Sequence, residues 1–279
     1  MLGKEATTEV LSMKPADLRD TARVNLMQGS RKEILENLAT ENIRAKPLAG
    51  VPEGIEITNG AAKLGSSLSY LRGEVMPQGL GSMLTVLALD PKPGEFIIDM
   101  AAAPGGKSCF IAERMQGEGR LLSNDSSTVR YRSLLFNLAR HHLSNVVFSN
   151  QDGQSLKETG VNRILLDAPC TGGGLLVSKP ERRTSRRIDD SIQLQRLQTQ
   201  LLRQALNMLE PGGICVYSTC AVSPIENEMV VERFQDLVEF QSLSIDGRNA
   251  YIESQQIGKR LYPHENFCDG FFIVKMVKI

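Results

Sequence analysis

The sequence predicts an α/β protein: a mixed, largely parallel sheet with helices on both faces, preceded by a small α+β module. From Gly79 onward, apolar runs of strand length alternate with amphipathic runs of helical length, which is typical of parallel strands joined by helices. An apolar run at 270–279 adds a last strand and makes the sheet mixed. A separate β-α-β pattern comes first. We therefore divide the chain into residues 1–74 and 75–279.

The N-terminal module is predicted from two strands and the helix between them. Residues 22–27 and 54–58 have strand-like apolar content. In residues 30–43, Ser30 and Glu33 have the spacing of a capping box, and apolar residues then follow on one helical face. The module is thus expected to fold around this one helix.

The elements of the second domain are predicted from apolar period and from the turn residues between runs. The long helix is indicated by Leu194, Leu197 and Leu201, with Asp189 near its start and the PGG at 211–213 as its stop. In chain order we expect a helix at 81–89, a strand at 95–101, a helix ending at 115, a strand at 120–125, a helix at 126–143, strands at 145–150 and 163–169, the long helix, and strands at 214–220 and 270–279.

Composition narrows the classes of function. The 32 basic and 32 acidic residues cancel, so contact with nucleic acid has to come from a local basic patch. The five cysteines are odd in number and form no CxxC pair, which favours a reducing compartment and no metal site. The N-terminus lacks the apolar core of a signal peptide, and no apolar run reaches membrane-spanning length. We expect a soluble intracellular protein without a membrane partner.

A Gly-rich turn between a strand and a helix, DMAAAPGGKS at 99–108, is the first candidate site. It lies at the sheet edge where open α/β folds bind ligands, and its glycines let backbone amides approach a ligand. Asp125 ends the next strand about 20 residues after Gly105, a spacing at which an acid reaches ribose hydroxyls. Asp152 follows the third strand at the same edge. A tight turn without ligand, and a turn aspartate before glycine, are the alternatives.

Two cysteines follow successive apolar strands. Cys170 lies in DAPCTGGG and Cys220 ends VYSTC. Either one alone is best explained as a buried structural thiol, the interpretation that we adopt for Cys109 and Cys215 inside apolar runs. Two thiols at the ligand edge, each in a specific motif, favour chemistry instead.

The motifs DMAAAPGGK, NDSSTVRYR, LLDAPCTGGG and VYSTCAVSPIENE together resemble the Sun/Nop family of S-adenosylmethionine-dependent RNA cytosine-5 methyltransferases. The resemblance covers nearly the whole chain. It is greatest to the nucleolar branch that modifies large-subunit ribosomal RNA, through YLRGEVMPQGLGSM, LQTQLLRQAL and RLYPHENFCDGFF, with archaeal transfer-RNA relatives close behind. It implies a Rossmann-like class I methyltransferase fold, S-adenosylmethionine as cofactor and RNA as partner, including pre-ribosomal particles. It also implies a monomer, nucleolar in a eukaryote and cytoplasmic otherwise.

The resemblance also implies roles for individual residues. Cys220 is the implied nucleophile, Cys170 helps to release product, Asp167 lies between cofactor and base, and Lys107 is a secondary catalytic candidate. The implied cofactor contacts are Ala101, Ala102, Ala103, Pro104, Gly105, Gly106, Lys107, Asp125, Arg130, Asp152 and Asp167.

Methylation at carbon 5 of cytosine explains why these residue types are needed. That carbon is a poor nucleophile, and a thiolate added at carbon 6 turns it into a good one. A free thiol has a pKa of about 8.5, so Cys220 needs a neighbour that favours its thiolate. Asp167 would stabilise charge that develops at the nitrogen-3 edge of the ring. A second cysteine can serve as acid or base when the carbon-5 proton leaves and the thioether breaks.

A basic segment at 178–187 follows the first cysteine loop and predicts a phosphate-binding surface. A solvated charged loop is its alternative. The target base has to be single-stranded or flipped out to expose its ring face, and the N-terminal module is expected to add RNA surface. The candidate RNA-binding residues are Lys179, Arg182, Arg183, Arg186 and Arg187.

Four other functions stay open on the sequence. A transfer-RNA substrate is the nearest alternative. An assembly factor could keep the fold and the RNA surface while its scaffold role outweighs catalysis. A DNA cytosine methyltransferase would use the proline-cysteine residue, Cys170, as nucleophile. A nicotinamide oxidoreductase is disfavoured because GxGxxG is missing.

Overall fold

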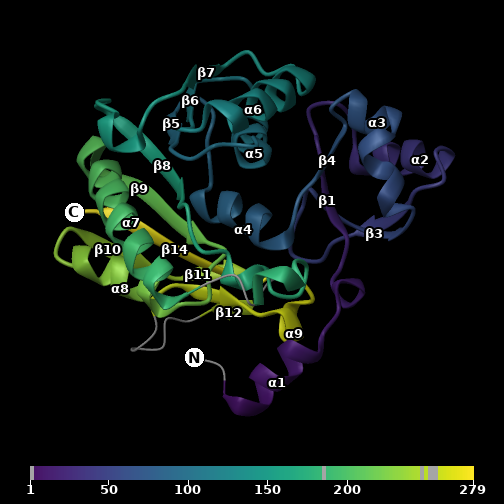
Figure 1. Cartoon of the computed structure of the whole chain (residues 1–279). Helices are drawn as coiled ribbons and strands as arrows, with labels where there is room; N and C mark the ends of the chain where they lie inside the picture. Colours follow the sequence, from purple (N-terminus) through teal and green to yellow (C-terminus); the bar gives the residue numbers. More distant parts are fainter. Residues whose placement is uncertain (1–2, 184–186, 246–247, 251–256) are drawn as a thin grey trace.

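A computed structural model describes residues 3–183, 187–245, 248–250 and 257–279 of the chain. It contains a small four-stranded sheet and a large eight-stranded sheet, with a short hairpin of β11 (Leu243–Ile245) and β12 (Arg248–Ala250) beside them (Figure 1). The larger sheet is mixed and has helices on both faces. The predicted α/β fold with a preceding α+β module is therefore confirmed.

The small sheet has the strand order β2-β3-β1-β4, and every neighbouring pair is antiparallel. As predicted, Ser30 and Glu33 form a capping box at the start of the helix: the Ser30 hydroxyl accepts from the Glu33 amide (3.3 Å), and the Glu33 carboxylate accepts from the Ser30 amide (2.8 Å). The elements of this part are α1 (Lys4–Ser12), β1 (Thr21–Val24), α2 (Arg31–Thr40), β2 (Arg44–Pro47), β3 (Gly54–Asn59), α3 (Leu68–Leu71) and β4 (Val75–Pro77).

Two features of this sheet differ from the sequence pattern. The first strand ends at Val24 rather than at residue 27, because Leu26 and Met27 leave the sheet and are 48% and 49% exposed. β2 and β4 were not predicted, since each is short and β2 is largely exposed. β4 lies just beyond residue 74 and pairs with β1. The small sheet therefore contains three strands from before residue 74 and one from after it.

The large sheet has the order β10-β14-β9-β8-β5-β6-β7, with β13 also paired to β14. Strands β9, β8, β5, β6 and β7 are parallel, whereas β14 is antiparallel to β9, β10 and β13. The bounds are β5 (Phe96–Asp99), β6 (Arg120–Asn124), β7 (Val146–Ser149), β8 (Val161–Asp167), β9 (Leu209–Thr219), β10 (Val238–Gln241), β13 (Lys259–Leu261) and β14 (Phe271–Lys278).

Alternating residues of the large sheet build two separate cores. Ile98 and Leu166 point to the face covered by α7 (Ile188–Met208) and α8 (Glu228–Val231). Ile97 and Leu165 point to the opposite face, against α4 (Leu80–Leu89) and α5 (Gly106–Arg114). Helix α6 (Thr128–Arg140) packs on α5, and α9 (Pro263–Asn266) contacts α1. Each fully buried side chain of this size contributes about 1.5–3 kcal/mol, so both faces anchor the sheet.

One predicted boundary in the larger domain is wrong. The PGG at 211–213 was expected to precede the strand, yet β9 starts at Leu209 and includes it. Leu209 pairs with Val161, and a register irregularity near Arg163 then lets the strand continue past Gly212, whose φ is +79°. The glycines therefore make a bulge within a strand rather than a loop before it.

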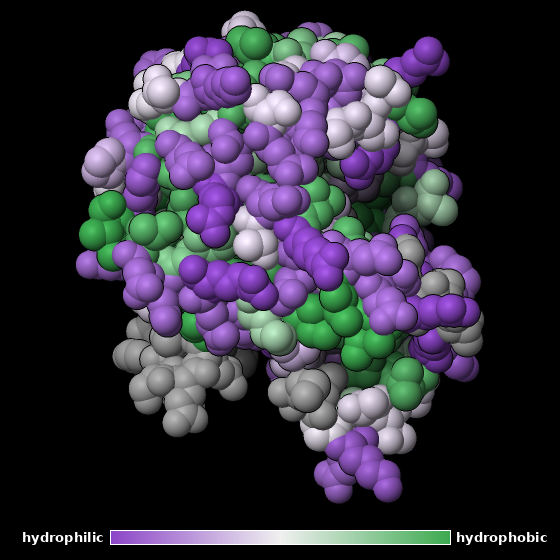
Figure 2. All heavy atoms as spheres, turned by 60° about the vertical axis from the view of Figure 1, so that its left-hand side comes forward, coloured by the Kyte–Doolittle hydropathy of each residue, from purple (hydrophilic) through white to green (hydrophobic). Residues whose placement is uncertain are grey.

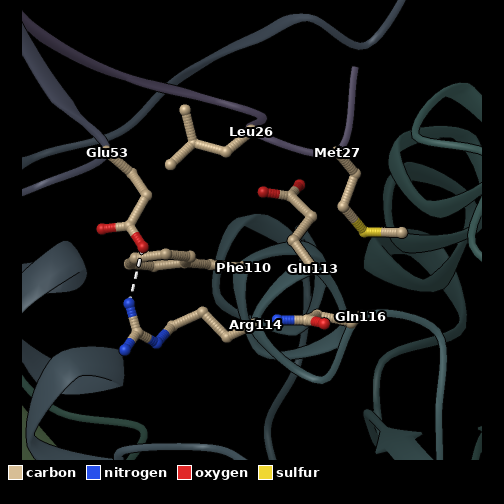
Figure 3. A pocket seen from close by; sticks show the side chains of 7 residues that line it. All are labelled: Leu26, Met27, Glu53, Phe110, Glu113, Arg114 and Gln116. Atoms are coloured by element: carbon tan, nitrogen blue, oxygen red, sulfur yellow. Dashed lines mark hydrogen bonds and ion pairs between the residues drawn. The ribbon is translucent and has the colours of Figure 1, made fainter. Parts of the chain in front are cut away.

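The two parts of the chain meet at the carboxyl end of α5. Buried Arg23 of β1 pairs with the Glu113 carboxylate, which also accepts from Nδ1 of His141 (2.7 Å). The adjoining cavity has a volume of about 520 Å³. Figure 3 shows Leu26, Met27 and Glu53 on one side of it and Phe110 and Arg114 of α5 on the other. The Gly-rich turn is at the opposite end of α5, so this cavity is separate from the candidate site.

Hydrophilic side chains predominate on the face shown in Figure 2, with apolar ones in small groups between them. Within the ranges described, none of the helices combines the length and the apolar character needed to cross a membrane.

Candidate active site

The two cysteines that follow β8 and β9 lie side by side. Because β8 and β9 are parallel neighbours, their carboxyl ends bring Cys170 and Cys220 together across fifty residues of sequence, with their sulfur atoms 3.2 Å apart. All five cysteines are free: Cys170 and Cys220 are partly buried, whereas Cys109, Cys215 and Cys268 are buried. The sheet thus builds a pair of thiols at the carboxyl ends of its parallel strands.

The surroundings of the pair distinguish the two sulfur atoms. The hydrogen bond from Cys170 lowers the pKa of Cys220, and the positive charges of Lys107 and Arg182 act in the same direction against burial and Asp167. The same bond, together with burial, raises the pKa of Cys170 well above its ordinary value. The favoured arrangement has the Cys170 thiol as the hydrogen-bond donor and the Cys220 sulfur as the acceptor, which makes Cys220 the more acidic thiol.

Asp167 is held from two sides at the end of β8. The Lys107 ammonium donates to Oδ2 (2.6 Å), and the Ser218 hydroxyl donates to Oδ1 (2.7 Å). Burial disfavours the charged form of Lys107, but attraction to Asp167 outweighs it, so the pKa of Lys107 is raised. Lys107 and Asp167 therefore form a fixed ion pair beside the cysteines.

Asp99, at the end of β5, was not identified from the sequence. Its side chain is fully buried, Oδ2 accepts from the Ser108 hydroxyl (2.7 Å), and Oδ1 has no partner among the described residues. Burial raises the pKa of Asp99 to about 7. Its position as the first residue of the DMAAAPGGK motif was the available signal, but burial cannot be read from a motif.

The turn from Ala101 to Lys107 leads from β5 into α5. Ala102 is buried against α6, the Ala103–Pro104 peptide is cis, and Gly105 has a φ of +107° that favours glycine. A Cβ atom on Gly106 would be in ordinary van der Waals contact with the Met76 and Gln78 side chains, at 3.7–3.9 Å. Pro104 is exposed and Gly106 is partly exposed, so the turn reaches the surface at the start of α5.

The acidic residues after β6 and β7 lie in different surroundings. Asp125 is fully buried and accepts from the amides of Ala103 (3.1 Å) and Ser127 (2.9 Å) and from Arg130 (3.2 Å). Its carboxylate thus holds the Gly-rich turn against β6. Asp152 is exposed and accepts from the Gln154 amide (2.9 Å). Its carboxylate is open to solvent at the same sheet edge.

The basic segment divides into residues that support loops and residues that face solvent. Arg182 donates to the Thr171 carbonyl (3.1 Å), next to Cys170. Arg183 donates to the carbonyls of Leu11 (2.9 Å) and Met13 (3.3 Å), which ties the end of α1 to this segment. Lys179 and Arg187 are exposed, and Arg186 lies outside the described residues.

Sequence reasoning also missed two buried polar residues behind the cysteines, Glu226 and Asn227. Both are 0% exposed and come from the end of VSPIENE. The sequence signal for them was an acidic residue next to an asparagine in VSPIENE, a run whose apolar residues follow neither helical nor strand periodicity.

Comparison with known proteins identifies the family. A profile of the 16S rRNA methyltransferase RsmB/F family matches residues 86–277. The chain is 35% identical over 278 residues to the 26S rRNA (cytosine-C(5))-methyltransferase nsun-1 of Caenorhabditis elegans, covering 93% of this chain and 42% of that protein. It is 34% identical over 276 residues to the tRNA (cytosine(49)-C(5))-methyltransferase of Pyrococcus abyssi, covering 94% of this chain and 88% of that protein.

A solved structure agrees with this result. A methyltransferase homologue from Pyrococcus horikoshii superposes with a TM-score of 0.84 at 34% identity, covering 98% of this chain and 90% of that one. The Sun/Nop resemblance drawn from the motifs is confirmed, as is the class I methyltransferase fold. The chain spans less than half of the length of the worm protein. Motifs, fold and relatives agree that this chain belongs to the RsmB/F family of RNA methyltransferases.

Proposed function

We propose that this protein is an S-adenosylmethionine-dependent RNA methyltransferase that forms 5-methylcytosine through a covalent bond between Cys220 and carbon 6 of the base. The observation that carries the proposal is the pair of sulfur atoms 3.2 Å apart at the carboxyl ends of adjacent parallel strands. The lowered pKa of Cys220 and the raised pKa of Cys170 make Cys220 the more acidic of the two thiols. Covalent catalysis with later release needs this difference.

The residues at the sheet edge fit the cofactor. Gly106 is partly exposed at the end of the glycine turn, so backbone amides at the start of α5 can approach a ligand. Asp152 follows β7 and offers an exposed carboxylate at the same edge of the sheet, where it can bind a polar group of the adenosine. Asp125 would act by holding the turn, and Arg130 is partly exposed beside it. S-adenosylmethionine, when bound, would supply a methyl group on a sulfonium.

The two cysteines account for the proton that is lost from carbon 5 when the base is methylated. The Cys220 thiolate adds to carbon 6, and the ring electron pair makes carbon 5 a nucleophile that takes the methyl group. Once Cys220 is alkylated, the Cys170 thiol no longer faces a thiolate, and its proton passes to solvent. The Cys170 thiolate then takes the carbon-5 proton, and the carbon–sulfur bond to Cys220 breaks. This step restores the thiol on Cys170 and the thiolate on Cys220.

Asp167 and Lys107 are assigned to the transition state of the addition. Negative charge moves into the pyrimidine ring when the thiolate adds. Asp167 would stabilise it by passing a proton from the Lys107 ammonium to nitrogen 3, and the proton would return when the carbon–sulfur bond breaks. The bonds from Lys107 and Ser218 hold the Asp167 carboxylate in one orientation. Lys107 also offsets the negative charge of Asp167 near Cys220.

Large-subunit ribosomal RNA is the proposed substrate, and transfer RNA is the alternative. The ribosomal assignment is supported by the worm relative and by a human 28S rRNA (cytosine(4447)-C(5))-methyltransferase that is 33% identical over 276 residues. The Pyrococcus abyssi transfer-RNA enzyme supports the alternative and matches this chain over more of its own length. The exposed Lys179 and Arg187 would contact phosphates, and residues 1–74 would add RNA surface.

Trapping with RNA that contains 5-azacytosine tests the chemistry. We expect a covalent adduct that is lost in Cys220→Ala and retained or increased in Cys170→Ala. The reverse result would indicate the order of a DNA cytosine methyltransferase and overturn the assignment. Rescue of ribosome production by Cys220→Ala would favour a scaffold role instead.

Bisulfite sequencing tests the RNA class. Ribosomal and transfer RNA from cells with and without the protein would be compared. Loss of a 5-methylcytosine from large-subunit ribosomal RNA is expected, whereas loss from transfer RNA alone would replace the ribosomal assignment with the alternative.

A further inference from the structure

A buried turn behind the cysteines joins both catalytic loops. It consists of the 3-10 turn Pro224–Glu226 and the following Asn227. The carbonyl of Glu226 accepts from the hydroxyl of fully buried Tyr217 in β9 (2.6 Å), which anchors the turn to the sheet. Two successive side chains, Glu226 and Asn227, then reach in different directions.

Glu226 holds the loop of Cys170. Its carboxylate accepts from the Thr171 amide (2.8 Å) and hydroxyl (2.6 Å), from the Ser191 hydroxyl (2.9 Å) and from Nε2 of Gln198 (3.2 Å). The same Gln198 amide also donates to the Pro169 carbonyl (2.9 Å). The residues on both sides of Cys170 are therefore fixed by one buried network. A charge buried with this many donors is firmly held.

Asn227 holds the loop of Cys220. Its Oδ1 accepts from the Thr219 hydroxyl (2.6 Å), and its Nδ2 donates to the Ala221 carbonyl (3.0 Å). The Thr219 hydroxyl in turn accepts from the Ala221 amide (3.1 Å). The residues on both sides of Cys220 are thus fixed by one side chain.

We propose that Glu226 and Asn227 are positioning residues with separate tasks: Glu226 orients Cys170 for product release, and Asn227 orients Cys220 for addition to the base. This inference rests on the proposed function. A reacting group misplaced by about 1 Å can lose about 100-fold in rate, so each bond set controls the step of the cysteine it holds. The hydrogen bonds of Glu226 and those of Asn227 share no loop residue. A variant of one residue should therefore affect product release or addition to the base, but not both.

The experiment measures the protein–RNA adduct after denaturation, with full-length protein and two probes. One probe is RNA purified from cells that lack the protein, and the other is the same RNA substituted with 5-azacytidine. In Glu226→Gln, an amide nitrogen replaces one acceptor and faces the donors of Thr171. We expect about fivefold more adduct on ordinary RNA than in wild type, with trapping on azacytidine RNA within about twofold. In Asn227→Ala, we expect trapping about tenfold slower and no accumulation.

Isosteric changes in the loops reach the same bonds with less disturbance of the interior. Thr171→Val removes the hydroxyl bond to Glu226, and Thr219→Val removes the one to Asn227. These two variants serve as the test if Glu226→Gln and Asn227→Ala fold poorly. Thr171→Val should then accumulate the adduct on ordinary RNA, and Thr219→Val should slow trapping on azacytidine RNA. The matched control is Glu113→Gln, another buried carboxylate, whose partners lie at the junction with the small sheet. It should lower stability and leave both adduct measurements as in wild type.

The outcomes separate this inference from the proposed function. If wild type forms no adduct that depends on Cys220, the proposed function fails, and this division of tasks fails with it. A second outcome is that the adduct forms but Glu226→Gln and Asn227→Ala, with or without Glu113→Gln, change both adduct measurements in proportion to their loss of thermal stability. In that case the turn is only structural. The proposed function would then stand without the separate tasks.

Discussion

The site depends first on single side chains whose surroundings set their protonation. Cys220 and Cys170 have the same chemistry in isolation, and one hydrogen bond together with the charges of Lys107 and Arg182 makes them different. Motifs in the sequence were sufficient to locate both cysteines. They could not reveal Asp99, Glu226 or Asn227, because the importance of these residues lies in complete burial and in partners far along the chain.

Oxidation should join the sulfur atoms of Cys170 and Cys220, which lie 3.2 Å apart. A peroxide attacked by the Cys220 thiolate would leave a sulfenic acid and hydroxide, and the Cys170 thiol would then displace water to form a disulfide. Peptide mapping after peroxide treatment should show a Cys170–Cys220 link and a mass loss of about 2 Da, with adduct formation abolished and restored by a thiol reductant. Cys170→Ser should stop at a sulfenic acid. A link that involves Cys109, Cys215 or Cys268 instead would contradict the geometry.

Asp99 should make stability depend on pH. Its folded pKa of about 7 is raised above its ordinary value, so the native state holds a proton that the unfolded state has released. Its contribution is therefore fully present below about pH 4 and is lost as pH rises through about 7. Asp99→Asn has no proton to lose. Its melting temperature should fall less than that of wild type between pH 5 and pH 8, and equal falls in both proteins would refute the assignment.

At the scale of elements, apolar period predicted the parallel strands and the long helices because those elements are buried along a whole face or stripe. The edge strands β2 and β4 lack that signal, β2 because its residues are largely exposed and β4 because it has only three residues. The start of β9 was missed for a different reason: its PGG looks like a stop in isolation, and only pairing with β8 draws it into the sheet. Pairing partners cannot be read from local sequence.

Gly174 should be the most sensitive glycine of the cysteine loops. A Cβ atom there would lie 2.1 Å from the Gly270 carbonyl oxygen and 2.8 Å from that of Cys220, both of them backbone atoms. Gly174→Ala should therefore push the Cys220 loop away and lower the rate of adduct trapping by more than about tenfold. Gly173→Ala is the matched control, because its Cβ atom would meet a movable Val222 side chain at 3.3 Å. Equal effects of the two changes would argue against the close backbone approach.

At the scale of the whole molecule, the small sheet and the methyltransferase domain are joined by buried charge. Burial lowers the pKa of Arg23 to about 10, so the guanidinium remains charged at neutral pH beside Glu113. Burial lowers the pKa of His141 to about 2, so a neutral imidazole donates to the same carboxylate. This junction was not predictable from the sequence, because Arg23 lies in an apparent strand and Glu113 in an apparent helix 90 residues away.

Arg23→Met should therefore destabilise the whole chain. Removal of the guanidinium leaves the Glu113 carboxylate buried beside a neutral histidine, and loss of one partner of a buried pair costs about 3–5 kcal/mol. Adding Glu113→Gln removes the stranded charge and should restore part of that free energy of unfolding in urea. The coupling between the two sites should then exceed about 1 kcal/mol, which a double-mutant cycle measures. Since Glu113 lies at the opposite end of α5 from the glycine turn, trapping of azacytidine RNA at low temperature should be unchanged in the folded Glu113→Gln single variant. Additive losses of stability would show instead that Arg23 acts through Gln78 and the ring of Phe110 rather than through Glu113.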